Sequence, residues 1–269
     1  MKFDFGFIGT GAMGGALAEA VAKNPNAYKI ALSDKDASKA EILAGKIGAT
    51  AVSVSEVACN AKYIYVGVKP HMLKGLFEEI SNSLETNNDF VIVSMAAGTS
   101  ISQIEEMIGK RIPIIRIMPN LPCSVGFGVT MASRNDLVSD ETFEIFKNGL
   151  SMSGFVDEVD ESMIDIGASV SGSGPAFAFM MIEALADGAV MCGFPRAKAY
   201  TYAAEMLIGS SKLFLETGKS PSELKDAVCS PKGTTIEGVK ALEDGGFRAS
   251  VIEAVVATYE KTKKIQKGN

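Results

Sequence analysis

The sequence predicts an α/β fold in two parts, a doubly wound parallel sheet at the N-terminus and an all-helical domain at the C-terminus. A strand, a glycine-rich loop and a helix follow one another over residues 3–22. Strand-like and helix-like segments then alternate up to about residue 120, which is typical of a parallel sheet with helices on both faces. After about residue 160 the remaining patterns are helical. We therefore expect one domain at residues 1–160 and a second at residues 161–269.

The first strand ends directly in a loop with the spacing GxGxxG, and an alanine-rich helix follows. In a Rossmann domain the first glycine permits a tight turn, the second lets the backbone approach a pyrophosphate, and the third lets helix and strand pack closely. The helix N-terminus adds free N–H groups and a positive dipole end. The spacing alone also fits a plain tight turn, but the strand–loop–helix order favours a dinucleotide. The predicted pyrophosphate contacts are Gly9, Gly11, Ala12, Met13 and Gly14.

The rest of the first half consists of short apolar segments typical of strands, which alternate with segments typical of helices. The expected strands cover residues 3–8, 29–32, 50–54, 63–68, 90–94 and 112–117. Helices are expected at 16–22, 37–47 and 73–84, and a capping box from Ser100 to Gln103 opens another. Because parallel strands end at one edge of a sheet, ligands are expected at that edge. Lys69 follows a strand there, and either lines the cofactor cleft or is an ordinary turn lysine.

Asp34 lies 20 residues beyond Gly14, where an acidic side chain binds the ribose hydroxyls and disfavours a 2′-phosphate. Ser33 and Lys35 flank it and could hold that phosphate instead. The third possibility is that Asp34 is an exposed turn residue that binds no ligand. The choice between NADH and NADPH therefore depends on this segment.

In the second half, a helix is expected from Ser173, as its cap, to about Cys192, with Pro175 in its first turn. Further helices are expected after Pro195 and at residues 220–228, 235–242 and 248–264. The helix from Pro175 is apolar on nearly all sides, and a domain of this size cannot bury it alone. We therefore expect a homo-oligomer formed through the helical domain.

Composition limits the function classes. The chain has 269 residues, a formal net charge of −6 and one histidine. The negative charge argues against nucleic acid or an anionic membrane as a partner. The single histidine argues against a His-dependent catalytic triad and against a His-rich metal site. No metal is expected. Four scattered cysteines without a CxxC pair indicate reduced thiols in the cytoplasm. The N-terminus lacks a signal-peptide pattern, and Glu183 and Asp187 interrupt the longest apolar run, so no membrane span is expected.

A second informative segment, CSPKGTT at residues 229–235, places hydroxyls, a glycine and a lysine before a helix. Free N–H groups at a helix start, together with threonine hydroxyls, suit a carboxylate. A capped helix start with no ligand is the alternative interpretation.

The chain resembles the pyrroline-5-carboxylate reductase family over essentially its whole length. The matching segments are GFIGTGAMG (6–14), VKP (68–70), SMAAG (94–98), RIMPNLP (116–122), VSGSGPAF (170–177) and LKDAVCSPKGTTIEGVKALEDGGFRASVIEAV (224–255). The usual loop of the family reads SPGGTT, so Lys232 replaces a glycine here. That departure leaves the threonines intact and puts a positive charge near the expected substrate carboxylate.

The resemblance implies a Rossmann domain that binds NAD(P)H, a helical domain that dimerises by interlocking helices, and reduction of Δ1-pyrroline-5-carboxylate to L-proline. It implies that Thr235 hydrogen-bonds the ring nitrogen and serves catalysis. On family grounds NADPH is expected. The implied further cofactor contacts are Ser33, Asp34, Lys35, Val68, Lys69, Pro70, Ala96, Ala97, Gly98 and Asn120. The implied substrate contacts are Ser230, Lys232, Gly233, Thr234 and Thr235, from a loop that the partner subunit can supply.

Three alternatives stay open. A β-hydroxyacid dehydrogenase shares the glycine-rich start, but its catalytic lysine has no counterpart between Gly174 and Gly193. A non-catalytic NAD(P) sensor would leave the 229–235 segment without a purpose. A reductase of a related cyclic imine differs only in ring size, which the sequence does not determine.

Overall fold

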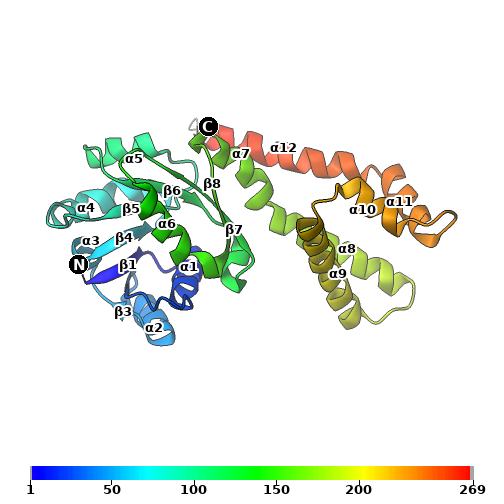
Figure 1. Cartoon of the computed structure of the whole chain (residues 1–269), viewed down its shortest axis with the longest axis horizontal. Helices are drawn as coiled ribbons and strands as arrows, with labels where there is room; N and C mark the ends of the chain where they lie inside the picture. The colour runs from blue at the N-terminus through cyan, green and yellow to red at the C-terminus, as the bar shows by residue number, and fades with distance from the viewer. Residues whose placement is uncertain (1, 267–269) are drawn as a thin grey trace. The chain divides into compact units, whose positions relative to one another are not determined.

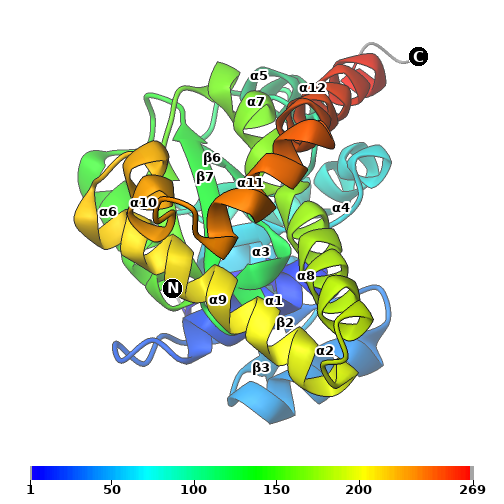
Figure 2. The ribbon, with the colours of Figure 1, turned by 90° about the vertical axis from the view of Figure 1, so that its right-hand side faces the viewer.

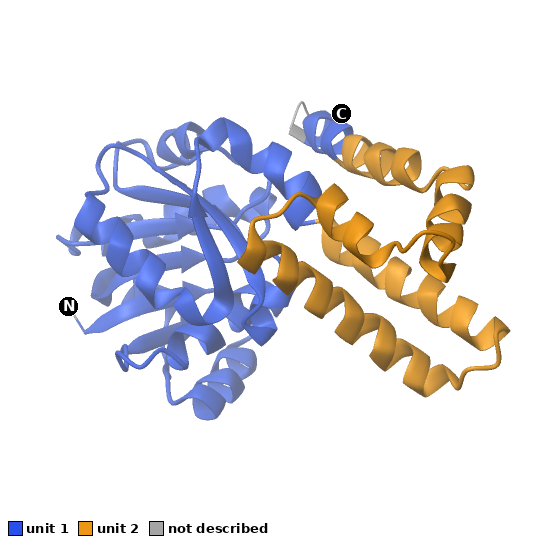
Figure 3. Cartoon of the chain, turned by 45° about the vertical axis from the view of Figure 1, so that its right-hand side comes forward, with its two compact units in different colours: residues 1–172, 259–269 blue, residues 173–258 orange. Residues whose placement is uncertain are grey.

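The computed structural model describes residues 2–266 and divides into two compact units (Figure 3). Unit 1 contains the residues up to Gly172 together with the end of the last helix from Tyr259, and unit 2 is Ser173–Thr258. The predicted functional division at 160/161 stays a prediction, and the last three residues of its second range lie outside the described residues.

Unit 1 is built on one eight-stranded sheet, within the described residues, in the order β3-β2-β1-β4-β5-β6-β7-β8 (Figure 1). Neighbouring strands are parallel except for β6 and β7, which are antiparallel. The predicted α/β class with a Rossmann sheet is confirmed. The strands are β1 (Phe3–Ile8), β2 (Ile30–Ser33), β3 (Thr50–Ala51), β4 (Ala61–Val66), β5 (Val91–Ser94), β6 (Ile114–Met118), β7 (Gly128–Arg134) and β8 (Gly154–Glu158).

Helices cover both faces of this sheet, each over its own apolar core. Strand residues alternate between the cores, so that Phe7 and Tyr65 face one and Ile64 and Val66 face the other. The first core includes residues of α1 (Ala12–Ala22), α2 (Ala37–Ile47) and α6 (Asp140–Gly149). The second includes residues of α3 (Val54–Asn60), α4 (Leu73–Glu85) and α5 (Ile101–Ile108). Unit 1 also contains α7 (Glu161–Ser171) and the 3-10 turns η1 (Pro70–Met72), η2 (Leu121–Val125) and η3 (Ser151–Ser153).

The predicted strand at residues 50–54 is shorter than expected, because Val54 already belongs to α3. Ser53 begins that helix, and its hydroxyl accepts a hydrogen bond from the Glu56 N–H at 3.2 Å. The S-x-x-E spacing of a helix start was present in the sequence. Helices α3, α6 and α7 and strands β7 and β8 were not predicted. The capping box at Ser100 is confirmed.

Unit 2 is helical throughout its described residues. Helices α8 (Gly174–Met191) and α9 (Arg196–Thr217) contact each other and form a helical hairpin, and Figure 2 shows the loop that joins them at one end. Ser173 is the N-cap residue of α8 and Pro175 lies in its first turn, as predicted, but the Ser173 backbone is already helical and its side chain makes no cap hydrogen bond. The helices are α8 (Gly174–Met191), α9 (Arg196–Thr217), α10 (Pro221–Val228), α11 (Thr234–Asp244) and α12 (Phe247–Gln266), the last of which ends in unit 1.

One helical stretch of the described chain, Glu161–Met191, is long and apolar enough by length and composition to cross a membrane, with a mean hydropathy of 1.3. This corrects the expectation, drawn from the interruption at Glu183 and Asp187, that no apolar run here is long enough to span a membrane. It is weak evidence for a membrane span, because a core helix of a soluble protein passes the same test. Within the single chain only 6% of its most apolar window is buried.

Candidate cofactor and substrate sites

The glycine loop, Gly9–Gly14, lies at the carboxyl end of β1, where the strand order changes direction. Gly9 has a φ of +97°, and its N–H donates to the Ser33 carbonyl at 2.8 Å. A Cβ at Gly14 would lie 2.1 Å from the Gly9 carbonyl oxygen, whereas a Cβ at Gly11 would meet nothing within 4 Å. The backbone is therefore open on the side where a ligand must approach.

Helix α1 begins at Ala12, and its N-cap, Gly11, offers no side-chain hydrogen bond. Its first turn contains no acidic residue. The first N–H groups and the positive dipole end are thus available to an anion. Together with the open side at Gly11, this arrangement fits the pyrophosphate of a dinucleotide.

Asp34, which follows β2, is bonded to the glycine loop. Its Oδ2 accepts hydrogen bonds from the Thr10 N–H at 2.7 Å and the Thr10 hydroxyl at 3.0 Å, and its Oδ1 accepts from the Asp36 N–H at 3.0 Å. Burial acts to raise the pKa of Asp34, but these hydrogen bonds and the charge of Lys39 outweigh it, so the pKa lies below its ordinary value. The carboxylate is therefore ionised at neutral pH. Sequence reasoning missed Thr10, although a hydroxyl inside the glycine loop was a signal.

The other predicted cofactor contacts also follow strands of the same sheet. Ser33 is buried at the end of β2, and Lys35 is exposed. The segment Val68–Pro70 follows β4, and the residues Ala96–Gly98 follow β5. Ala96 packs into the second core at 3% exposure, which leaves its backbone as the group that a ligand could contact.

Asn120 follows β6 and is 7% exposed. Its Nδ2 donates to the Ser171 carbonyl at 2.8 Å, and its Oδ1 accepts from the Val129 N–H at 2.9 Å. The side chain therefore connects the exit of β6 to the end of α7 and the start of β7. Its expected contact with the nicotinamide stays a prediction.

Arg116 is a buried cation in β6 that sequence reasoning did not single out. Its guanidinium lies 3.2 Å from Glu161 Oε1 and 2.8 Å from Asp165 Oδ1, on α7. The same Glu161 oxygen accepts the Ile101 N–H at the start of α5, at 2.7 Å. A charge inside an apolar strand, IIRIM, was the signal, since a buried charge must be paired. The cluster lines an open groove that continues to Gly98.

The predicted substrate residues lie in unit 2, between α10 and α11. The Gly233 N–H donates to the Ser230 carbonyl at 3.0 Å, which closes a turn with Pro231 and Lys232 at its centre. Gly233 is the N-cap of α11 and has no side chain with which to cap it. Thr234, in the first turn, is exposed, and so is Thr235. The turn thus presents two hydroxyls and the N–H groups of a helix start.

The structure gathers the cofactor candidates at one edge of the sheet, after β1, β2, β4, β5 and β6, and the substrate candidates in one turn of unit 2. No group of three or more metal-ligating side chains lies together among residues 2–266.

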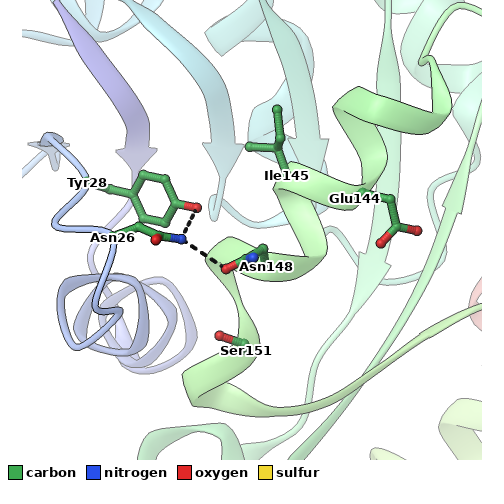
Figure 4. Close-up of a pocket in the computed structure, with 6 residues that line it drawn as sticks. All are labelled: Asn26, Tyr28, Glu144, Ile145, Asn148 and Ser151. Atoms are coloured by element: carbon green, nitrogen blue, oxygen red, sulfur yellow. Dashed lines mark hydrogen bonds between the residues drawn. The ribbon is translucent and has the colours of Figure 1, made fainter.

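A second hollow in unit 1 lies away from the glycine loop, at the segment that precedes β2. Asn26 donates to the Tyr28 hydroxyl at 3.0 Å and to Asn148 Oδ1 at 3.2 Å, as Figure 4 shows. Asn24 donates to the Asn148 carbonyl at 2.6 Å and to Ser151 at 3.1 Å. These amides connect the turn after α1 to the end of α6, which is a structural role.

Two family models match the chain. Residues 4–98 match the model described as NADP oxidoreductase coenzyme F420-dependent, and residues 161–265 match the model of pyrroline-5-carboxylate reductase dimerisation. The pyrroline-5-carboxylate reductase of Escherichia coli (strain K12) is 42% identical over 99% of this chain and 100% of its own. The chain belongs to the pyrroline-5-carboxylate reductase family.

Solved structures of the family have the same fold. The pyrroline-5-carboxylate reductase of Coxiella burnetii is 30% identical, with a TM-score of 0.90 over 98% of both chains. The Plasmodium falciparum pyrroline carboxylate reductase, solved with NADP bound, is 28% identical, with a TM-score of 0.85 over 98% of this chain and 99% of that one. Membership identifies the chain as an oxidoreductase with a pyridine-nucleotide cofactor.

Proposed function

We propose that this chain is an NAD(P)H-dependent pyrroline-5-carboxylate reductase, which reduces Δ1-pyrroline-5-carboxylate to L-proline in the last step of proline biosynthesis. The full-length match to a named reductase is the observation that carries the proposal. The open glycine loop and the uncapped start of α11 support it, since they suit a pyrophosphate and a carboxylate respectively.

In this proposal one set of residues binds the cofactor and another set binds the substrate. The cofactor is held by the glycine loop and by the backbone at the ends of β2, β4, β5 and β6, and when bound its reduced nicotinamide supplies the hydride. Backbone N–H groups at Lys232, Gly233 and Thr234 hold the substrate carboxylate, with Ser230 shaping the turn. The Thr235 hydroxyl hydrogen-bonds the ring nitrogen. Because a protonated imine already accepts a hydride readily, positioning is the main requirement and no strong acid is needed.

An initial-rate assay with Δ1-pyrroline-5-carboxylate and Thr235 variants tests this proposal. We expect Thr235→Val to lower kcat roughly 10²-fold, since the isosteric valine removes only the proton-handling hydroxyl. Thr235→Ser should keep most activity, and cofactor binding, followed by nicotinamide fluorescence, should be the same in all three proteins. Unchanged kinetics in Thr235→Val would remove the hydroxyl from the mechanism. No turnover by the wild-type chain would contradict the proposed function and leave the related-imine and sensor alternatives.

We propose NADPH as the preferred cofactor. The NADP-bound relative supports this preference, as do the exposed ammonium groups of Lys35 and Lys39 beside the end of β2. Both carboxylate oxygens of Asp34 already accept hydrogen bonds from the chain, which lessens their availability to ribose hydroxyls. The ionised carboxylate nevertheless repels a 2′-phosphate.

The ratio of kcat/KM for NADPH to that for NADH tests the preference. We expect a ratio above one that rises further, by roughly tenfold, in Asp34→Ser, because one unfavourable charge is removed. Lys35→Ser, which removes a cation at the same place, should lower the ratio. A ratio well below one in the wild-type chain would identify Asp34 as a ribose-binding residue and NADH as the cofactor.

The proposed context is a cytoplasmic homodimer, or an oligomer of such dimers, that does not bind nucleic acid or membranes. Four cysteines without a disulfide are compatible with a reducing compartment. In this arrangement a second copy of the chain covers the apolar surface of α8, and a lipid bilayer does not.

A further inference from the structure

The turn that leads into α11 contains a lysine in an unusual backbone conformation. Lys232 has a φ of +59°, in the left-handed region that glycine adopts without cost. It is one of two non-glycine residues with positive φ among the described residues, the other being Ala27. A branched or long side chain in this region is strained, so Lys232 destabilises its own turn relative to a glycine.

The rest of the turn leaves little room for this strain to be relieved. The Gly233 N–H must reach the Ser230 carbonyl at 3.0 Å, and a Cβ at Gly233 would lie 2.4 Å from Ser230 Oγ. Pro231 fixes its own φ immediately before Lys232. The left-handed conformation at position 232 is therefore imposed by the turn, whichever residue stands there.

The charge of Lys232 is not used to stabilise the chain. Its side chain is exposed, and none of the ion pairs among residues 2–266 includes it. The lysine and aspartate before the turn, Lys225 and Asp226, pair with each other at 3.0 Å. Lys232 therefore costs stability without a compensating contact in the described chain, beside the uncapped N-terminus of α11.

We infer that the Lys232 side chain is a specificity-determining cation of the substrate turn, which strengthens the binding of imines that carry a carboxylate over imines that lack one. This inference rests on the proposed function, which places the substrate carboxylate at the same turn. The ammonium group adds a long-range attraction to the short-range N–H groups of Lys232, Gly233 and Thr234. A pair of exposed charges about 4 Å apart in water is worth roughly a fivefold change in affinity.

Three substitutions separate the charge from the backbone strain. Lys232→Arg keeps both, Lys232→Asn removes the charge and tolerates the left-handed conformation, and Lys232→Gly removes charge and strain together. Lys219→Asn is the control, because it removes the same charge from another exposed position of unit 2, outside the proposed site.

The experiment is steady-state kinetics of the full chain with Δ1-pyrroline-5-carboxylate and with carboxylate-free 1-pyrroline, at ionic strengths of about 0.01 M and 0.2 M, where screening lengths differ severalfold. In Lys232→Asn and Lys232→Gly we expect KM for the carboxylate substrate to rise roughly three- to fivefold, with kcat within twofold, while KM for 1-pyrroline, whose protonated form is a cation, does not rise. The salt dependence of kcat/KM should flatten. Lys232→Arg and Lys219→Asn should behave like the wild type.

Thermal unfolding at fixed protein concentration supplies the second readout. We expect the Tm of Lys232→Gly and Lys232→Asn to rise by about 2–4 °C while substrate binding weakens. A residue with a purely structural role would not give higher stability together with weaker substrate binding. Equal KM values and equal salt slopes in all active variants would overturn this inference alone. No turnover of Δ1-pyrroline-5-carboxylate by the wild-type chain would overturn the proposed function and this inference together.

Discussion

Two tyrosines on β4 point into the same apolar core but differ in hydrogen bonding. The Tyr63 hydroxyl donates to the Thr142 carbonyl at 2.7 Å, whereas the Tyr65 hydroxyl is buried without a partner in the described structure. The Tyr65 ring stacks on Phe7 at 4.5 Å between ring centroids. Burial raises the pKa of Tyr65 well above its ordinary value, and burial followed by the charge of Asp89 raises that of Tyr63. Both hydroxyls are therefore neutral at any physiological pH.

We predict opposite effects of the same change at these two positions. Tyr65→Phe removes a hydroxyl whose unpaired burial costs about 1–3 kcal/mol, so the Tm should rise by several degrees. Tyr63→Phe removes a made hydrogen bond, and the Tm should fall. Thermal unfolding of both variants at one protein concentration measures the difference. A fall in both would show that the Tyr65 hydroxyl has a partner, such as a buried water.

At the residue scale, the sequence predicted features that a local rule dictates. The roles of Gly9 and Gly14 follow from backbone geometry, and the structure bears out the tight turn and the close packing. The Thr10–Asp34 contact joins residues 24 positions apart, so it depends on how β1 and β2 pair and no local pattern predicts it. The backbone strain at Lys232 could be recognised only from its φ angle in the structure.

At the element scale, α7 is attached to the sheet at both ends. Arg116 pairs with Glu161 and Asp165 near its first turns, and Asn120 donates to the Ser171 carbonyl at its end. Both anchoring residues belong to β6 or the segment directly after it. The helix is thereby fixed against the strand that carries one of the predicted cofactor contacts.

We predict that Arg116→Met destabilises the chain by about 3–5 kcal/mol, because it leaves two acidic groups without their buried cation. Adding Glu161→Gln and Asp165→Asn should recover part of the loss, since the neutral amides no longer need the charge. Urea unfolding of the two variants measures both effects.

Arg111→Met is the matched control for this prediction. The Arg111 side chain is 60% exposed, and it pairs with Asp136, which is 72% exposed, and with Glu105 at 3.7 Å, so the loss should stay below about 1 kcal/mol. An equally small loss in Arg116→Met would mean that the buried cluster contributes no more than a surface ion pair.

The elements that the sequence predicted are those with a strong local period. The apolar runs of β4 and β5 and the long helices of unit 2 were recognised within a few residues. The antiparallel β7 was missed, because the expected pattern of parallel strands ended at β6 and because GVTMASR contains few large apolar residues. Its place is fixed by close backbone packing, since a Cβ at Gly154 would lie 2.2 Å from the Gly128 carbonyl oxygen. Such packing depends on the tertiary structure and produces no periodic pattern of apolar residues in the sequence.

At the scale of the whole molecule, the two units bury their apolar side chains very differently. Unit 1 has two continuous cores, one on each face of its sheet. In α8, by contrast, Ala186 is the buried residue, and Met180 and Phe179 are 67% and 58% exposed. A helix with this composition is stable in water only when another surface covers it. The match of residues 161–265 to a dimerisation model supports a further copy of the chain as that surface.

We predict that the wild-type chain sediments as a dimer or a larger even-numbered assembly at micromolar concentration. Met180→Glu places a charge in the apolar surface of α8 and should shift the chain toward the monomer, with a Tm that falls on dilution. Ile42→Glu makes the same change at a residue of α2 that is 74% exposed and lies outside the matched dimerisation region, so it should leave the assembly intact. Analytical ultracentrifugation across a hundredfold range of concentration distinguishes the three proteins. A wild-type monomer throughout that range would contradict the prediction.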